Sequence, residues 1–423
     1  MSTAPEGGVG AERAAPRARI VAALLTVLLV CARFAERSPL ISWRGEVPSP
    51  GLSLERSGLR LLLSPVASLF EQWSLLTIPE HVAVFGTVLL IAGSIRSYRS
   101  RRCATSWHDR IAAGVVGGAR AVIVTVAIAL AGALVPWPMS SLHHDDPDVV
   151  AVDFHSHTNQ SHDGRWDFDV AANRQWHREG GFDVAYITDH ADSAHASVMP
   201  PADGALPVVL TGAEFRSGGA HVVRLGQPND RESVLLLTTP FAVGAPKLLL
   251  ASQTRIVGVE VADASPRGLQ CLRETPGQLR DATQLLHAVP IASSNLHGWG
   301  RTVAAWTLLR LPGWRRDSPT RLDARIRALL RSANPAATTI VLRRAVHTST
   351  RDRAFILPLM LWTTMQLLDD DEVWIWLAWI WIPTLAPLAQ RALSRVGRKA
   401  GRTRVAVPSE APAMADARAA VSL

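Results

Sequence analysis

The sequence predicts an α/β domain with a largely parallel sheet, flanked by transmembrane α-helices. Three observations lead to this prediction. In residues 146–345, short aliphatic and β-branched runs alternate with helical stretches, which is the pattern of an α/β fold. Long apolar runs lie before and after this region. Hydrophobic residues make up 48% of the 423-residue chain and charged residues only 19%, a balance that fits one globular domain combined with membrane segments.

The central region, residues 146–345, is expected to form the globular domain. Short strands that alternate with short helices favour a parallel sheet covered by those helices. The strand-like runs are 149–152, 184–187, 208–210, 222–225, 234–237 and 256–261, and the helical candidates include 169–178 and 278–287.

Residues 20–145 are expected to form a membrane region with about three spanning helices. The run 20–30 fits a signal anchor better than a cleaved signal peptide, because charges follow it directly and no clear cleavage site appears. The run 82–95, extendable back to residue 78, and the run 115–137 approach the ~20 residues that a bilayer core requires.

Charged residues distinguish three other segments. The apolar run 59–76 contains Arg60 and Glu71, so it is expected to be an interfacial helix rather than a span. Residues 1–19 and residues 391–423 are basic, and both are expected to be disordered.

Basic loops set the expected orientation. Cytoplasmic loops carry an excess of Lys and Arg, so the loop after residue 95 is expected inside the cell and the central domain outside, on a protein of the plasma membrane. The opposite orientation stays open, because the C-terminal membrane region, residues 354–390, fits either one crossing or two. The basic residues of the loop are Arg96, Arg99, Arg101, Arg102 and Arg110.

Composition also excludes some classes of protein. The net charge is +8, but the basic residues cluster beside apolar runs and form no stripe with interleaved aromatic residues. A nucleic-acid partner is therefore not expected. Cys31, Cys103 and Cys271 form no Cys-x-x-Cys pair, which excludes zinc ribbons and dithiol redox motifs.

The residues that carry chemistry begin at the end of the first central strand. The motif Asp153-Phe154-His155-Ser156-His157-Thr158 follows an apolar run. Alternation along a strand places His155 and His157 on one face, where two imidazoles can bind a Zn, Mn or Fe ion. Asp153 shares that face and is expected to orient a histidine. Taken alone, this motif is explained equally well by two incidental histidines.

Ligand-type residues recur at the ends of several later strands. Incidental placement would require an independent coincidence at each strand, so the recurrence favours a metal centre. These residues are His162 and Asp163, Asp189 and His190, Glu214, His221, and His297.

In this order and spacing, the motifs resemble the PHP (polymerase and histidinol phosphatase) domain of metal-dependent phosphoesterases. The resemblance covers about residues 148–302 and implies a distorted seven-stranded β/α barrel that binds one to three divalent metal ions. It also implies hydrolysis of a small-molecule phosphate ester, or a related ester, by a metal-bound hydroxide. It rests on Asp-x-His-x-His-Thr at 153–158, Ser-x-Asp-Gly at 161–164, Ile-Thr-Asp-His at 187–190 and Gly-x-Glu at 212–214.

The resemblance implies a set of ligands for three metal sites. His155 and His157 bind the first ion, and Glu214 bridges it to a second. His221 belongs to the second site, and His162 is an alternative to Asp163 in the third. The implied catalytic residues are His155, His157, Asp163, His190, Glu214 and His297, of which Asp163, His190 and His297 form the third site.

Two positions depart from the family pattern. Thr239 stands where the family usually has a histidine, and Asn295 stands where it usually has an aspartate. Both are weaker metal ligands, so the first and second sites are expected to bind metal less tightly or not at all.

The sequence therefore predicts a membrane-anchored, metal-dependent hydrolase, most simply a phosphoesterase, whose partners are a small phosphate ester and the lipid bilayer. One alternative, which Thr239 and Asn295 keep open, is a degenerate barrel that binds a ligand or partner without catalysis. Another is a membrane scaffold with an accessory domain.

Overall fold

The computed structural model describes residues 9–45, 51–101, 106–190, 206–226 and 230–403. The chain forms two compact units, one of Met1–Val27 with Trp376–Leu423 and one of Leu28–Ile375. In the first unit, the Trp381 indole of helix α12 (Asp370–Thr403) donates a 3.0 Å hydrogen bond to the Thr26 hydroxyl of helix α1 (Val9–Phe34). These helices extend into the segments 1–19 and 391–423, which were expected to be disordered; residues 1–8 and 404–423 lie outside the described residues.

In the described residues, a mixed ten-stranded sheet with the order β1-β12-β11-β4-β5-β6-β7-β8-β9-β10 forms the core of the second unit. The predicted α/β class is confirmed. Four neighbouring pairs of this sheet are parallel and five are antiparallel over the described strands. The strands are β1 (Leu40–Ser42), β4 (Val149–Ser156), β5 (Val184–Ile187), β6 (Val208–Ser217), β7 (Ala220–Leu225), β8 (Val234–Leu237), β9 (Ile256–Ala262), β10 (Val289–Ala292), β11 (Ala305–Arg310) and β12 (Thr338–Arg343).

The expectation of a seven-stranded, largely parallel barrel is wrong. Strand β6 turns back into β7 at Gly218 and Gly219, whose φ angles of 58° and 76° suit a two-residue hairpin turn. At the other edge, β11, β12 and β1 add antiparallel strands. The sheet is nevertheless curled, since the Thr307 hydroxyl of β11 hydrogen-bonds the backbone of Ala292 in β10 at 2.7 and 2.8 Å.

Helices cover the sheet and complete its core. The predicted helices 169–178 and 278–287 correspond to α6 (Val170–Gly180) and α9 (Pro276–Leu285). The Asp169 carboxylate caps α6 by accepting a 2.8 Å hydrogen bond from the Ala172 N–H. The remaining helices of this region are α7 (Ala245–Ala251), α8 (Pro266–Glu274) and α10 (Pro319–Arg331), and α10 packs Ile326 into the cluster that contains Phe154 and Tyr186.

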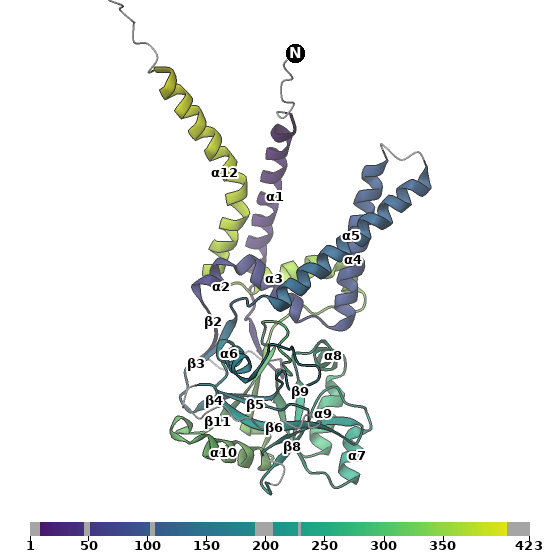
Figure 1. The fold of residues 1–423 in the computed structure, drawn as a ribbon, viewed down its shortest axis with the longest axis vertical. Helices are drawn as coiled ribbons and strands as arrows, with labels where there is room; N and C mark the ends of the chain where they lie inside the picture. The colour runs from purple at the N-terminus through teal and green to yellow at the C-terminus, as the bar shows by residue number, and fades with distance from the viewer. Residues whose placement is uncertain (1–8, 46–50, 102–105, 191–205, 227–229, 404–423) are drawn as a thin grey trace, which may run out of the picture. The chain divides into compact units, whose positions relative to one another are not determined.

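Helices α4 (Ile78–Ser100) and α5 (Trp107–Leu134) are long and apolar enough to cross a membrane. They run side by side (Figure 1), because glycines let their backbones approach closely. A Cβ atom on Gly118 would lie only 2.7 Å from the Leu89 carbonyl oxygen. These helices match two of the about three spans expected before residue 145, whereas the run 20–30 lies in α1.

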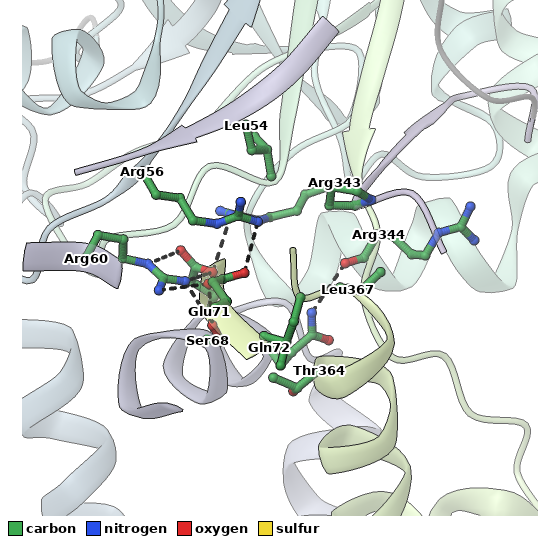
Figure 2. Close-up of a pocket in the computed structure, with 13 residues that line it drawn as sticks. Leu54, Arg56, Arg60, Ser68, Glu71, Gln72, Arg343, Arg344, Thr364 and Leu367 are labelled. Carbon is green, nitrogen blue, oxygen red and sulfur yellow. Dashed lines mark hydrogen bonds and ion pairs between the residues drawn. The ribbon is translucent and has the colours of Figure 1, made fainter. Parts of the chain in front are cut away.

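The segment 59–76, expected to be an interfacial helix, forms α2 (Gly58–Leu62) and α3 (Ser64–Ser74). Its two charged residues pair with each other inside the unit, where Arg60 Nη2 lies 2.8 Å from Glu71 Oε2. Figure 2 shows Arg56, Arg60 and Arg343 gathered around Glu71. Together with Glu372, which Arg56 and Arg60 contact at 3.3 and 3.4 Å, these residues are called the arginine cluster.

The described chain also contains a second, two-stranded sheet, helix α11 and three short 3-10 helices, Trp314–Arg316, Pro335–Ala337 and Asp352–Phe355. Strands β2 (Leu52–Arg56) and β3 (Ser140–His144) pair as a separate two-stranded sheet. Helix α11 (Ile356–Gln366) precedes α12 and packs with α3 and α4 in a cluster that contains Trp73, Val84 and Ile356.

Candidate metal centre

Strands β4 and β6 bring three buried side chains together. Strand β4 carries His155 and is followed directly by His157, and β6 carries Glu214. Their exposed fractions are 2%, 0% and 3%. The Nε2 atoms of the two histidines lie 3.0 Å apart, and Glu214 Oε2 lies 3.4 Å from the first and 3.3 Å from the second.

These three atoms form a triangle of the size expected for three ligands of one tetrahedrally coordinated metal ion. Zinc binds imidazole nitrogen and carboxylate oxygen at ~2.0–2.2 Å, and a tetrahedral angle then separates two such ligands by about 3.4 Å. The observed edges of 3.0–3.4 Å are close to that separation. The donor set and its geometry therefore suit a divalent ion of the Zn, Mn or Fe type.

Hydrogen bonds on the far side of each imidazole orient it. The Ser161 hydroxyl donates to Asp189 at 2.9 Å, so its oxygen accepts the 2.9 Å bond from His157 Nδ1–H. His155 Nδ1 lies 3.3 Å from Glu260 Oε1, and an ionised carboxylate only accepts. We infer that both rings carry a proton on Nδ1 and turn Nε2 toward Glu214, as metal-binding histidines do.

The electrostatics of the site favour a positive charge between these groups. Burial lowers the pKa of His155, but Glu214 and Glu260 outweigh it and hold this pKa well above its usual value. Burial, assisted by His155, lowers the pKa of His157 well below its usual value. Although burial raises the pKa of Glu214, the neighbouring histidines lower it strongly, so this carboxylate is ionised. A proton or a metal ion can supply the charge that the carboxylates attract.

Two more groups extend the centre outward from Glu214. His190 Nδ1 lies 3.2 Å from Glu214 Oε2, and His221 Nδ1 lies 2.7 Å from Glu214 Oε1. His190 Nε2 also lies 3.5 Å from Asp163 Oδ2, and His162 completes a third group with these two residues. Glu214 is thus shared by the first and second groups, and His190 by the second and third.

His297 joins the outer side of the centre. Its ring stacks on His157 with the centroids 4.1 Å apart, and its Nε2 lies 3.0 Å from the Asn295 side-chain oxygen. Since Nε2–H donates to Asn295, Nδ1 carries a lone pair, yet it lies 3.2 Å from Asp163 Oδ1 and makes no hydrogen bond within the described residues. A cation bound between His297 Nδ1 and Asp163 Oδ1 would interact favourably with both acceptor atoms.

The expected ligands therefore converge, with one difference in grouping. The third group, whose potential ligand atoms lie within 4.8 Å of one another, is His162, Asp163 and His190, whereas His297 reaches this group through Asp163 at 3.2 Å. His162 and Asp163 both belong to the group, so they are not alternatives in the structure.

Thr239 and Asn295, the two residues that differ from the family pattern, contact buried carboxylates next to the candidate metal centre. The Thr239 N–H donates to Glu260 Oε2 at 2.9 Å, and its hydroxyl lies 3.3 Å from the same oxygen. The Asn295 side-chain N–H donates to Asp263 at 3.2 Å. Both residues hold a buried carboxylate in place next to the centre.

Sequence reasoning missed two parts of this region. Asp263 is fully buried behind the centre, and its position directly after strand β9 was the available signal. Asp153 was expected to orient a metal-binding histidine, but its Oδ2 lies 2.7 Å from His177 Nε2 instead. His177 is buried on α6, and the spacing of the buried residues Asn173, Trp176, His177 and Gly180 is that of a helix face turned to the core.

Comparison with known proteins identifies no family. No protein-family model matches the chain, and no curated protein matches it. Among solved structures, PsfC from Pseudomonas syringae matches with 14% identity over 52% of this chain and 100% of its own, with a TM-score of 0.32. A TM-score this low supports no conclusion about the fold or function of the chain.

Proposed function

We propose that the chain is a membrane-anchored, metal-dependent hydrolase that acts on phosphate esters. The observation that supports this proposal is the buried triangle of His155 Nε2, His157 Nε2 and Glu214 Oε2, with edges of 3.0–3.4 Å. The donor set alone does not identify a reaction, because it also occurs in proteins that only bind metal. The reaction class is suggested by the resemblance of the motif order to PHP domains.

The residues of the centre have distinct proposed roles. A bound divalent ion would supply a Lewis acid that lowers the pKa of a water ligand towards ~7. His155 and His157 would hold the ion through Nε2, and Glu214 would share its two oxygens between neighbouring positions. Asp163 and His297 lie at the outer side, with side-chain exposures of 44% and 21%, where a substrate can reach them. Burial lowers the pKa of His297, so it is available near neutral pH as a proton acceptor.

The membrane anchor in this proposal is the hairpin of α4 and α5. Arg96, Arg99, Arg101 and Arg110 lie where the two helices meet, and the positive-inside rule places that turn in the cytoplasm. The α/β unit joins the opposite ends of both helices, so the same rule places it outside the cytoplasm.

The hydrolase proposal is tested on the purified full-length protein. Loaded with Zn²⁺ or Mn²⁺, it is expected to hydrolyse p-nitrophenyl phosphate; EDTA should abolish the activity and the added metal should restore it. Protein that binds metal stoichiometrically but turns over neither this monoester nor the bis(p-nitrophenyl) diester would contradict the proposal.

The orientation is tested in intact cells with a membrane-impermeant thiol reagent. In a chain whose three cysteines are replaced by alanine, Arg310→Cys on the exposed surface of the unit should be labelled, because its side chain is 67% exposed. Arg99→Cys, in the last turn of α4, should be protected. Protection of Arg310→Cys with labelling of Arg99→Cys would reverse the proposed orientation.

A binding module without catalysis is the second candidate. Thr239 and Asn295 favour it, because each contacts a carboxylate behind the centre and neither lies among the side chains that converge on the triangle. Metal binding without hydrolysis in the assay above is the result this candidate predicts.

A further inference from the structure

A pocket of about 350 Å³ lies beside the candidate metal centre, a size typical of small-molecule sites. The loop that contains Asn295 and His297 forms one wall. Helices α3, α4 and α5 contribute mostly apolar side chains to the lining, with Ser74 and His81 as the polar ones; the apolar residues are Phe70, Trp73, Ala129, Gly132 and Ala133.

His297 belongs both to the lining of this pocket and to the outer side of the candidate metal centre. It lines the pocket, its ring stacks on His157, and its Nδ1 lies 3.2 Å from Asp163. A ligand with an apolar body against α5 can therefore present its other end to the outer side of the centre.

The pocket is also attached to one of the two apolar helices. The Gly300 N–H, three residues after His297, donates to the Ala133 carbonyl of α5 at 3.2 Å. The Trp176 indole holds the same residue by donating to the Gly300 carbonyl at 3.3 Å. The wall formed by α5 thus belongs to a helix long and apolar enough to cross a membrane.

Exposed tryptophans mark the same face. Trp299 lines the pocket, is 47% exposed, and pairs with Trp166, which is 74% exposed, at 6.2 Å between ring centroids. Tryptophan is enriched where a protein meets the interface between membrane and water. This placement is consistent with a pocket whose entrance lies at the bilayer surface.

We propose, on the basis of the proposed function, that the substrate is a phosphate monoester of a long-chain alcohol, with its hydrocarbon chain against Phe70 and Ala129. Its phosphate lies beside His297, next to the centre, where a divalent ion held by Asp163 would offset the phosphate charge. In the reaction, the oxygen of water bonds to phosphorus, the bond from phosphorus to the alcohol oxygen breaks, and a proton passes to that oxygen. The products are the long-chain alcohol and inorganic phosphate.

The test compares ethyl phosphate with octyl phosphate, below its critical micelle concentration, on full-length metal-loaded protein in phosphatidylcholine nanodiscs. A buried methylene contributes up to about 4-fold to binding, so kcat/KM for octyl phosphate is expected to exceed that for ethyl phosphate by at least about 100-fold.

Two variants of α5 locate the effect. Ala129→Phe fills the pocket and is expected to reduce kcat/KM for octyl phosphate at least about 10-fold, while its metal content shows that the variant is folded. Ala127→Phe adds the same side chain at an exposed position outside the pocket lining and should keep the preference for the longer ester.

The outcomes separate this inference from the proposed function. Equal kcat/KM for the two esters, or a chain-length preference that Ala129→Phe leaves intact, would overturn the lipid substrate while the hydrolase proposal stands. Absence of turnover of ethyl, octyl and aryl phosphates by metal-loaded protein would overturn both.

Discussion

The candidate metal centre and the arginine cluster are both buried and both rich in ionisable side chains, but their charges are satisfied differently. In the arginine cluster, Glu71 lies between Arg60 and Arg343, at 2.8 and 3.3 Å. Burial raises the pKa of Glu71, yet Arg343 and Arg60 outweigh it and lower this pKa to about 2. In the candidate metal centre, the groups that face Glu214 are four imidazoles.

This difference is the basis for proposing a structural role for the arginine cluster and a metal-binding role for the candidate metal centre. Guanidinium groups are permanently charged and have no lone pair to offer, so the arginines of this cluster cannot bind a metal ion. Imidazoles are neutral or charged near physiological pH, and the hydrogen bonds of Ser161 and Glu260 turn their lone pairs inward. We therefore expect mutations to affect metal and activity at one site and stability at the other.

The largest effect is expected from His157→Ala. It removes one corner of the triangle, so the protein should lose bound metal, and its kcat for aryl phosphate should fall by about 10³-fold or more. Metal analysis and steady-state kinetics measure the two effects. Unchanged rates would show that the active site lies elsewhere.

Arg60→Ala should act on stability instead. Removing one partner from a buried ion pair leaves an uncompensated charge, which costs about 3–5 kcal/mol of unfolding free energy. Denaturant unfolding in detergent measures this loss, and the folded fraction should keep its metal. The matched control is Arg310→Ala, whose pair with Asp146 at 2.7 Å is exposed to solvent and is expected to contribute little to stability. An equally small loss of unfolding free energy in Arg60→Ala and Arg310→Ala would contradict a stabilising role of the arginine cluster.

Ser161→Ala is a finer test of the candidate metal centre. It deletes the hydroxyl that accepts from His157 Nδ1, and losing such an orienting partner typically weakens metal affinity about 10–100-fold. Competition titration with a chelating dye measures this affinity, and Ser252→Ala on the surface should leave it unchanged. Equal affinity in the two variants would mean that Ser161 does not orient the ligand.

The smallest expected effect is a pH dependence at Asp263. Burial, and after it Glu260, raise the pKa of Asp263 from 3.8 to about 7. The folded state therefore binds a proton more tightly than the unfolded state. This contribution to stability is present below pH 3.8 and lost as the pH rises through about 7.

Asp263→Asn should remove that loss. Thermal unfolding in EDTA measures this effect. The midpoint of the variant minus that of the unaltered protein is expected to be larger at pH 8 than at pH 5. A difference between the two proteins that does not change with pH would show that Asp263 titrates normally.

Local signals in the sequence predicted much of this arrangement. Strand alternation placed His155 and His157 on one face, and a helix was expected where Asp169 caps α6. The turn at Gly218 and Gly219 joins two strands that were both expected, at 208–210 and 222–225, and it makes them antiparallel, so the sheet is less parallel than the sequence predicts.

Other features depend on contacts between distant segments. The pairing of Arg60 with Glu71 requires α2 and α3 to fold against β12 and the start of α12, so these charges in an apolar run suggested an interface instead. The burial of Asp263 likewise depends on the loop of Asn295, thirty-two residues further along the chain. Periodicity within one segment contains no information about either contact.

The most direct test of the central claim is the metal content of the purified full-length protein under metal-replete conditions. At least one Zn, Mn or Fe ion per chain is expected, falling well below one in His157→Ala and remaining unchanged in Arg60→Ala. Less than one ion per chain in the unaltered protein, or equal content in His157→Ala, would contradict the assignment of His155, His157 and Glu214 as a metal centre.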